Sequence, residues 1–129
     1  MSRRIQTHLT PGAVNETVVL ANDAPNEKSG ANHEYLIGKP TKLPDGDGVE
    51  ILSTIKFHQG PLAKAEDLAG ITNESLLAIL IDRFQGFQRG QFSCRENAIV
   101  LTKLEEAMLW TKKRTADRVL RGVEGTHTK

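Results

Sequence analysis

Three arginines near the C-terminal end of the chain have a spacing that could hold phosphate groups. Arg114, Arg118 and Arg121 recur at helical spacing, which places them within about 60° of one another on one face of an α-helix. Fixed guanidinium groups bind phosphate oxygens through paired, charge-assisted hydrogen bonds. The alternative is a solvated basic face near a helix C-terminus, where the helix dipole favours cations. The pattern therefore predicts either a phosphate site or a solvent-exposed basic patch.

Phe87 and Asn97 form a second pair of candidates, earlier in the same helical region. A phenyl face stacks on a purine, and an amide reads the edge of the base. The alternatives are a core position for Phe87 and a hydrogen bond to the adjoining loop for Asn97. On one helix, Asn97 and Arg114 would lie about 25 Å apart. A small nucleotide does not span that distance, so one ligand can touch both residues only if they come from different copies in an antiparallel dimer.

The overall charge and composition exclude several classes of partner. Among 129 residues there are 17 Lys and Arg against 16 Asp and Glu, so no strong field attracts a nucleic-acid polymer. A single cysteine, Cys94, excludes an internal disulfide and suits a reducing cytosol. No apolar run reaches the roughly 18 residues that a membrane span needs. We expect a cytoplasmic protein that has neither a nucleic-acid polymer nor a membrane as partner.

Sequence signatures of catalysis are missing. The chain has neither a Walker-type glycine loop nor a dinucleotide-binding fingerprint. Its four histidines are scattered, without the spacing of metal ligands. We therefore expect no catalytic residue, no metal and no cofactor, and a protein that binds a nucleotide rather than converting it.

The N-terminal part of the chain has the composition of β-strands. Alternating or β-branched residues predict strands at 5–9, 14–20, 35–37 and 49–57,. The last candidate has apolar residues at period two, which predicts one continuous apolar face. Those residues are Val49, Ile51, Ile55 and Phe57, with Ser53 between them. The proline- and glycine-rich segment 44–48 predicts a turn before this strand.

The C-terminal part changes to helical spacing. Thr72 is expected to cap a first helix, and a capping box of Ser93 and Glu96 to open a second. The second helix is expected to run to about Arg121, where Gly122 stops it. A short link predicts an antiparallel hairpin. The predicted fold class is therefore α+β. A small antiparallel β-sheet in residues 1–62 is followed by a two-helix antiparallel hairpin in residues 63–129. We expect the hairpin to contain the nucleotide pocket and the two parts to pack as one unit.

Residues 84–126 resemble the helical hairpin shared by phage proteins that sequester immune nucleotide signals. The resemblance rests on five motifs: Cys94-Arg95-Glu96-Asn97, Leu104-Glu105-Glu106-Ala107, Trp110, Arg114-Thr115 and the segment 121–126. Two kinds of protein share this hairpin. The anti-CBASS sponge is almost wholly helical, whereas the Thoeris anti-defence sponge carries a β region ahead of the hairpin. The strands predicted in residues 1–62 favour the second kind.

The resemblance implies a ligand and a set of residues that bind it. Thoeris anti-defence sponges bind glycocyclic ADP-ribose, a cyclic ADP-ribose isomer, and hold it intact so that the immune effector is not activated. The positions that match the family are Phe87 and Asn97 for the adenine and Arg114 and Arg118 for the phosphates. The family pocket lies between protomers, which implies a homo-oligomer, a dimer or a hexamer, in the cytoplasm of the infected bacterial host.

Other functions remain open at this stage. Some members of the family also bind cyclic trinucleotides at a separate site. The alternatives are an anti-CBASS cyclic nucleotide sponge and a hydrolase of the immune signal. A third is a structural hairpin oligomer whose arginines pair with acidic partners.

Overall fold

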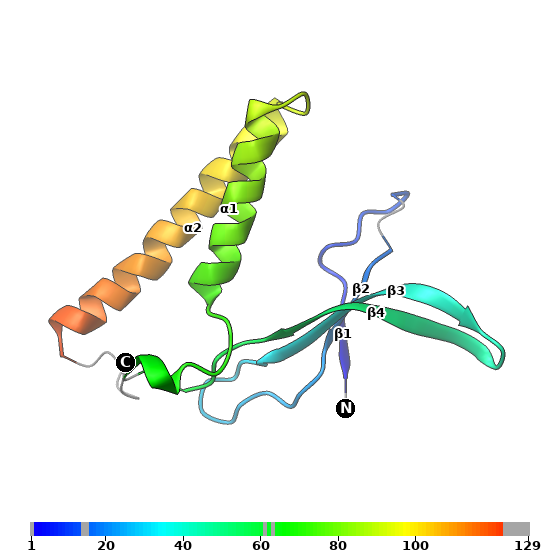
Figure 1. Ribbon diagram of the computed structural model, residues 1–129, viewed down its shortest axis with the longest axis horizontal. Helices are drawn as coiled ribbons and strands as arrows, with labels where there is room; N and C mark the ends of the chain where they lie inside the picture. The colour runs from blue at the N-terminus through cyan, green and yellow to red at the C-terminus, as the bar shows by residue number, and fades with distance from the viewer. Residues whose placement is uncertain (1, 14–15, 61, 63, 123–129) are drawn as a thin grey trace. The chain divides into compact units, whose positions relative to one another are not determined.

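The protein consists of two compact units, Met1–Phe57 and His58–Lys129. The computed structural model (Figure 1) describes residues 2–13, 16–60, 62 and 64–122. The first unit is a four-stranded sheet and the second contains two helices that pack together. The predicted α+β class is confirmed. No helix in the described part of the chain is both long and apolar enough to cross a membrane.

The sheet is an antiparallel meander in which each strand pairs with the next along the chain. Its strands are β1 (Arg3–Ile5), β2 (Val18–Ala21), β3 (Glu34–Leu43) and β4 (Gly46–Lys56). The expected strand at 5–9 is wrong beyond Ile5, because the chain turns there and the imidazole of His8 bonds the carbonyl of Thr17 at 2.7 Å. The expected strand at 14–20 begins at Val18, and residues 14 and 15 lie outside the described part.

Strand β4 contains one extra residue relative to β3, and this changes which side chains share a face. Ile37 pairs with Ser53, whereas the next residue, Gly38, pairs with Ile51, so Leu52 is a β-bulge. Paired residues share a face of the sheet, and a slip of one residue reverses that face. Val49 and Ile51 therefore lie on the face opposite Ile55, and the prediction of one continuous apolar face is wrong.

The bulge also brings the two backbones close together at Gly38. A Cβ atom at this position would lie 2.5 Å from Val49 Cγ1 and 2.6 Å from the carbonyl oxygen of Glu50. No larger residue fits without a shift of the strand. The turn between the strands is at Pro44 and Asp45, within the predicted segment 44–48, whereas residues 46–48 already belong to β4. The positive φ of 136° at Gly46 suits a glycine,.

The loop between β2 and β3 is organised by the carboxylate of Asp23. It accepts hydrogen bonds from Asn32 Nδ2 at 3.0 Å and from the backbone N–H groups of His33 at 2.9 Å and Glu34 at 3.3 Å. The side-chain bond from Asn32, followed by the backbone bond from His33, lowers the pKa of Asp23 below its ordinary value,. The charged form of Asp23 is therefore the form that stabilises this loop.

Stability is expected to depend on pH through this carboxylate. Because the pKa of Asp23 is lowered in the folded state, its contribution is fully present above the ordinary value of 3.8 and is lost as pH falls through the lowered value,. Asp23→Asn should lower the urea midpoint at neutral pH, and this difference from the parent should shrink as the pH falls below 3.8,. A difference that stays the same throughout an acid titration would contradict the role of the charge.

Both helices have the predicted ends, with one correction. Helix α1 (Asn73–Arg89) is capped by Thr72, whose hydroxyl accepts from Ser75 N at 3.2 Å. Helix α2 (Arg95–Leu120) is followed by Gly122 with a φ of 73°, the left-handed residue that ends many helices,. The predicted capping box of Ser93 and Glu96 is wrong. The cap is Cys94, whose Sγ accepts from Asn97 N at 3.4 Å.

The helices pack side by side (Figure 1), but few of their side chains are buried between them. Among the described residues of α1 and α2, only Arg118 is buried. Large apolar side chains remain exposed, including Ile79 at 62%, Leu109 at 68% and Trp110 at 64%. A pair of helices has one seam, so the outer sides of its apolar stripes have nothing to pack on within the hairpin.

Candidate functional site

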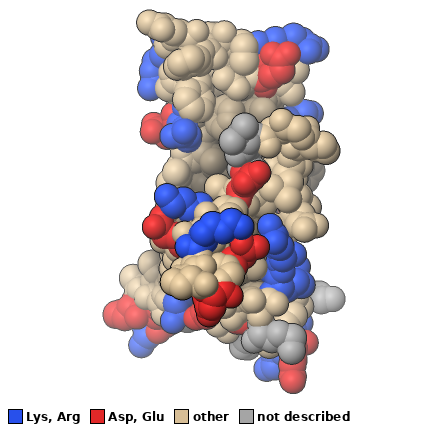
Figure 2. All heavy atoms as spheres, turned by 90° about the vertical axis from the view of Figure 1, so that its right-hand side faces the viewer, with Lys and Arg blue, Asp and Glu red and all other residues tan. Residues whose placement is uncertain are grey.

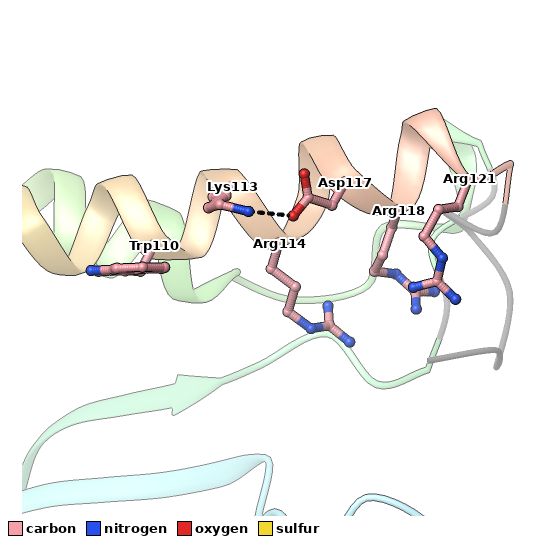
Figure 3. A pocket seen from close by; sticks show the side chains of 6 residues that line it. All are labelled: Trp110, Lys113, Arg114, Asp117, Arg118 and Arg121. Atoms are coloured by element: carbon pink, nitrogen blue, oxygen red, sulfur yellow. Dashed lines mark hydrogen bonds and ion pairs between the residues drawn. The ribbon is translucent and has the colours of Figure 1, made fainter.

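An open groove runs along the C-terminal half of α2 and has a volume of about 590 Å³ (Figure 3). Its lining consists of Trp110, Lys113, Arg114, Asp117, Arg118 and Arg121. The three arginines predicted to share a helix face therefore line one surface. Their guanidinium groups point to the same side of the helix (Figure 3). The groove thus combines an aromatic side chain with three cations.

The remaining two charges of the groove largely neutralise each other. Lys113 Nζ and Asp117 Oδ2 form an ion pair of 2.7 Å across one helical turn. In Figure 3 this pair lies above the guanidinium groups, which project downward from α2. The net positive charge of the groove therefore comes from the arginines, whose planar forks match the oxygens of a phosphate.

The arginines differ in exposure. Arg114 is exposed, whereas Arg118 has only 6% of its surface accessible. A buried guanidinium has already lost most of its side-chain freedom. The binding of an anion to Arg118 therefore costs little further side-chain entropy.

The basic surface formed by the three arginines is small, and it suits a few phosphates. On the face shown in Figure 2, basic and acidic side chains are interspersed, unlike the continuous basic stripe of a protein that binds a nucleic-acid backbone,.

Phe87 lies in the last turns of α1 and is partly enclosed by its neighbours. Its ring meets that of Phe84 edge to face, with centroids 5.5 Å apart. The guanidinium carbon of Arg83 lies 5.0 Å from the Phe87 centroid, which is within the range of a cation–π contact. Arg83 was not among the residues predicted from the sequence. Its position four residues before Phe87, one helical turn away, could have indicated this contact.

Asn97 lies in the first turn of α2. Its Nδ2 donates to the carbonyl of Phe92 at 3.1 Å. The loop hydrogen bond that the sequence left as an alternative is therefore present. It uses the nitrogen side of the amide, so the other side of the amide, Oδ1, is not part of this bond.

One chain does not bring the two candidate pairs together. Helix α2 is continuous from Arg95 to Leu120, so Asn97 and Arg114 are separated by about 25 Å of helix. Phe87 and Asn97 lie at the turn of the hairpin, and Arg114 and Arg118 lie near the far end of α2. Within one protomer these are two separate half-sites.

The described residues contain no group of three or more His, Cys, Asp or Glu side chains that could hold a metal ion. Cys94 is exposed and its sulfur serves as the cap of α2. Apart from Lys113 and Asp117, which pair with each other, the side chains of the two half-sites are guanidinium, indole, phenyl and amide groups. Such groups bind charge, stack and donate or accept hydrogen bonds, and they are poor nucleophiles and poor bases at neutral pH.

The chain has an antiparallel sheet followed by a two-helix hairpin with a basic groove. These features define a hairpin-domain protein. Residues 50–116 match the model of a known family, described as Acb2/Tad1, hairpin domain. The match covers more than half of the chain, and the chain belongs to this family. Phe87, Asn97 and Arg114 lie inside the matched segment, whereas Arg118 and Arg121 follow it.

The chain is also similar to a curated phage protein. Thoeris anti-defense 1 of Bacillus phage SBSphiJ7 is 48% identical over 92 residues, which cover 71% of this chain and 64% of the relative. The chain therefore spans just under two thirds of that relative's length. The predicted resemblance of the hairpin to that of the Thoeris anti-defence proteins is confirmed at the level of the family.

Proposed function

We propose that this protein is an anti-Thoeris sponge, which binds glycocyclic ADP-ribose and holds it without cleavage. The observation that carries the proposal is the groove in which Arg114, Arg118 and Arg121 lie on one side of α2 beside Trp110. Three cations and one aromatic ring match a molecule with a pyrophosphate and sugars. The family and the similarity to Thoeris anti-defense 1 support this ligand.

The base of the ligand binds at the turn of the hairpin in this proposal. The adenine stacks on the ring of Phe87, and the amide of Asn97 reads its edge. The two phosphates bind Arg114 and Arg118. Each contact to a charged group contributes about 1.5–3 kcal/mol, so the phosphate end provides much of the affinity.

A complete pocket then requires two copies of the chain. Because about 25 Å of helix separates Asn97 from Arg114, one ligand reaches both only when they come from different protomers. An antiparallel arrangement places the turn of one hairpin beside the arginine groove of the other, and the two-fold axis generates a second pocket. The exposed Ile79, Leu109 and Trp110 supply apolar surface for such an assembly,. We propose a homo-oligomer of this kind, either a dimer or a hexamer built from dimers.

The N-terminal sheet distinguishes between the two branches of the family. The anti-CBASS sponge is almost wholly helical, whereas this chain has a four-stranded sheet before the hairpin. This favours the Thoeris signal over a cyclic oligonucleotide. The protein would act in the cytoplasm of the infected bacterium, where the signal is made.

The test of the proposal is recovery of the ligand. The protein is mixed with glycocyclic ADP-ribose, filtered to remove free ligand, and heated until it unfolds. Chromatography is expected to find the ligand released and chemically unchanged, because none of the four proposed contact residues, Phe87, Asn97, Arg114 and Arg118, is a good nucleophile or base at neutral pH. Recovery of a cleavage product would contradict the proposed sponge function and show that the protein is a hydrolase of the signal. Calorimetry with a cyclic trinucleotide provides the comparison with the CBASS signals.

A further inference from the structure

The amide of Asn97 is held in one orientation at the turn of the hairpin. Its nitrogen, Nδ2, lies 3.1 Å from the carbonyl oxygen of Phe92. A carbonyl oxygen only accepts hydrogen bonds, so the donor side of the amide must face it. The acceptor atom Oδ1 then faces away from Phe92, together with the second N–H of the amide.

The turn that carries this carbonyl is itself tied to both helices. Cys94 N donates to Gln88 Oε1 of α1 at 3.2 Å. Asn97 N donates to Cys94 Sγ at 3.4 Å, which anchors the first turn of α2 to the same loop. The carbonyl of Phe92 and the side chain of Asn97 are therefore placed by one hydrogen-bonded turn, and Asn97 is itself partly buried.

This orientation matters because an asparagine amide is nearly symmetric in shape. After a flip of 180° it exchanges its donor and acceptor, and a free asparagine can pair with either kind of purine edge. A 6-amino purine presents a donor at position 6 beside an acceptor nitrogen. A 6-oxo purine presents an acceptor at position 6, so it requires the flipped amide or leaves polar groups unpaired.

We propose that the Phe92 carbonyl is the specificity element of this site, because it locks Asn97 in the orientation that accepts a 6-amino purine and rejects a 6-oxo purine. The inference rests on the proposed function, in which Asn97 reads the base. A 6-oxo purine must either break the bond between Asn97 and Phe92 or leave Oδ1 of Asn97 facing an acceptor, without a donor. A site built around a donor or acceptor discriminates strongly against the analogue that lacks its partner.

The test compares two ligands in which a 6-amino purine is exchanged for a 6-oxo purine, a change that also turns N1 from an acceptor into a donor. Calorimetry is carried out with glycocyclic ADP-ribose and with its hypoxanthine analogue, in which the 6-amino group is replaced by oxygen. The parent protein is expected to bind the analogue at least about tenfold more weakly. In Asn97→Ala the two affinities should lie within about twofold of each other, whereas Asn73→Ala, the same change at an exposed residue of α1, should keep the parental ratio.

The outcomes separate this inference from the function on which it rests. If the parent binds both ligands tightly and equally, the locked amide is overturned and the sponge function stands. If the parent binds neither ligand, both proposals fail. If Asn97→Ala keeps the parental ratio, selection at position 6 resides elsewhere.

A second measurement examines the lock without any ligand. In protein labelled with ¹⁵N, the side-chain amide protons of Asn97 should exchange with solvent about fivefold more slowly than those of Asn73, because of these two residues Asn97 has the protecting bond to a backbone carbonyl,. Equal exchange rates would show that the amide rotates freely, and would overturn the lock.

Discussion

Replacing both Arg114 and Arg118 by alanine is expected to weaken the binding of glycocyclic ADP-ribose by more than a hundredfold. Each arginine is proposed to make charge-assisted bonds to a phosphate, and such bonds contribute about 1.5–3 kcal/mol each. Two of them amount to about 3 kcal/mol or more, which corresponds to more than two orders of magnitude in Kd. Arg114→Lys with Arg118→Lys should recover only part of the loss, since an ammonium group cannot bind two oxygens in fork geometry. Calorimetry measures all of these affinities.

Controls separate this effect from damage to the fold. Arg118 is buried, so the double variant is checked by circular dichroism and thermal unfolding. The single variant Arg114→Ala removes an exposed side chain and is expected to fold normally while losing about tenfold or more in affinity. Lys112→Ala changes the same part of α2 on the opposite face and should bind as the parent does. Unchanged affinity in folded Arg114→Ala and in the folded double variant would favour a structural hairpin oligomer instead.

Mixing two variants that each bind glycocyclic ADP-ribose weakly is expected to restore tight binding. One variant carries Asn97→Ala, and the other carries Arg114→Ala with Arg118→Ala. In a mixed antiparallel dimer, one pocket combines the intact Asn97 of one chain with the intact arginines of the other, while the second pocket has lost both. Random pairing of equal amounts should restore about one quarter of all pockets, and purified mixed dimers about half. The number of sites from calorimetry measures this fraction directly.

The mixing experiment distinguishes a shared pocket from one built within a single chain. If each pocket used residues of one protomer only, every pocket in the mixture would carry a damaging substitution. No tight binding would then return at any ratio of the two variants. The parent protein, unmixed and subjected to the same exchange procedure, shows whether the subunits survive the treatment.

The helix ends could largely be predicted from the sequence, because they depend on residues that are close together in the chain. Thr72 caps α1 and Gly122 follows α2 as predicted, because caps and stops act through hydrogen bonds within one helical turn. The position of the second cap was wrong by one residue. Ser93 and Cys94 are adjacent, and the helix begins where Gln88 on α1 holds the backbone of Cys94, which is a contact from the other helix.

The β-sheet shows the limit of reading a strand by itself. The alternation of Val49, Ile51, Ile55 and Phe57 predicted one apolar face, but the bulge at Leu52 divides it. A bulge depends on how two strands pair, and it is placed here where Gly38 of β3 allows the backbone of β4 to approach,. The pattern within one strand contains no information about the register of its partner.

By itself, the sequence determined the basic face of α2, the two capped helices and the membership of the hairpin in its family. These follow from spacing along one helix and from motifs that occupy adjacent positions. Only the tertiary structure decided the contents of each half-site, with Arg83 over Phe87, Arg118 buried, and Asn97 bonded to the carbonyl of Phe92. The orientation of a side chain depends on how neighbouring turns fold back against it. Residue types and spacings alone do not specify the conformation of those turns.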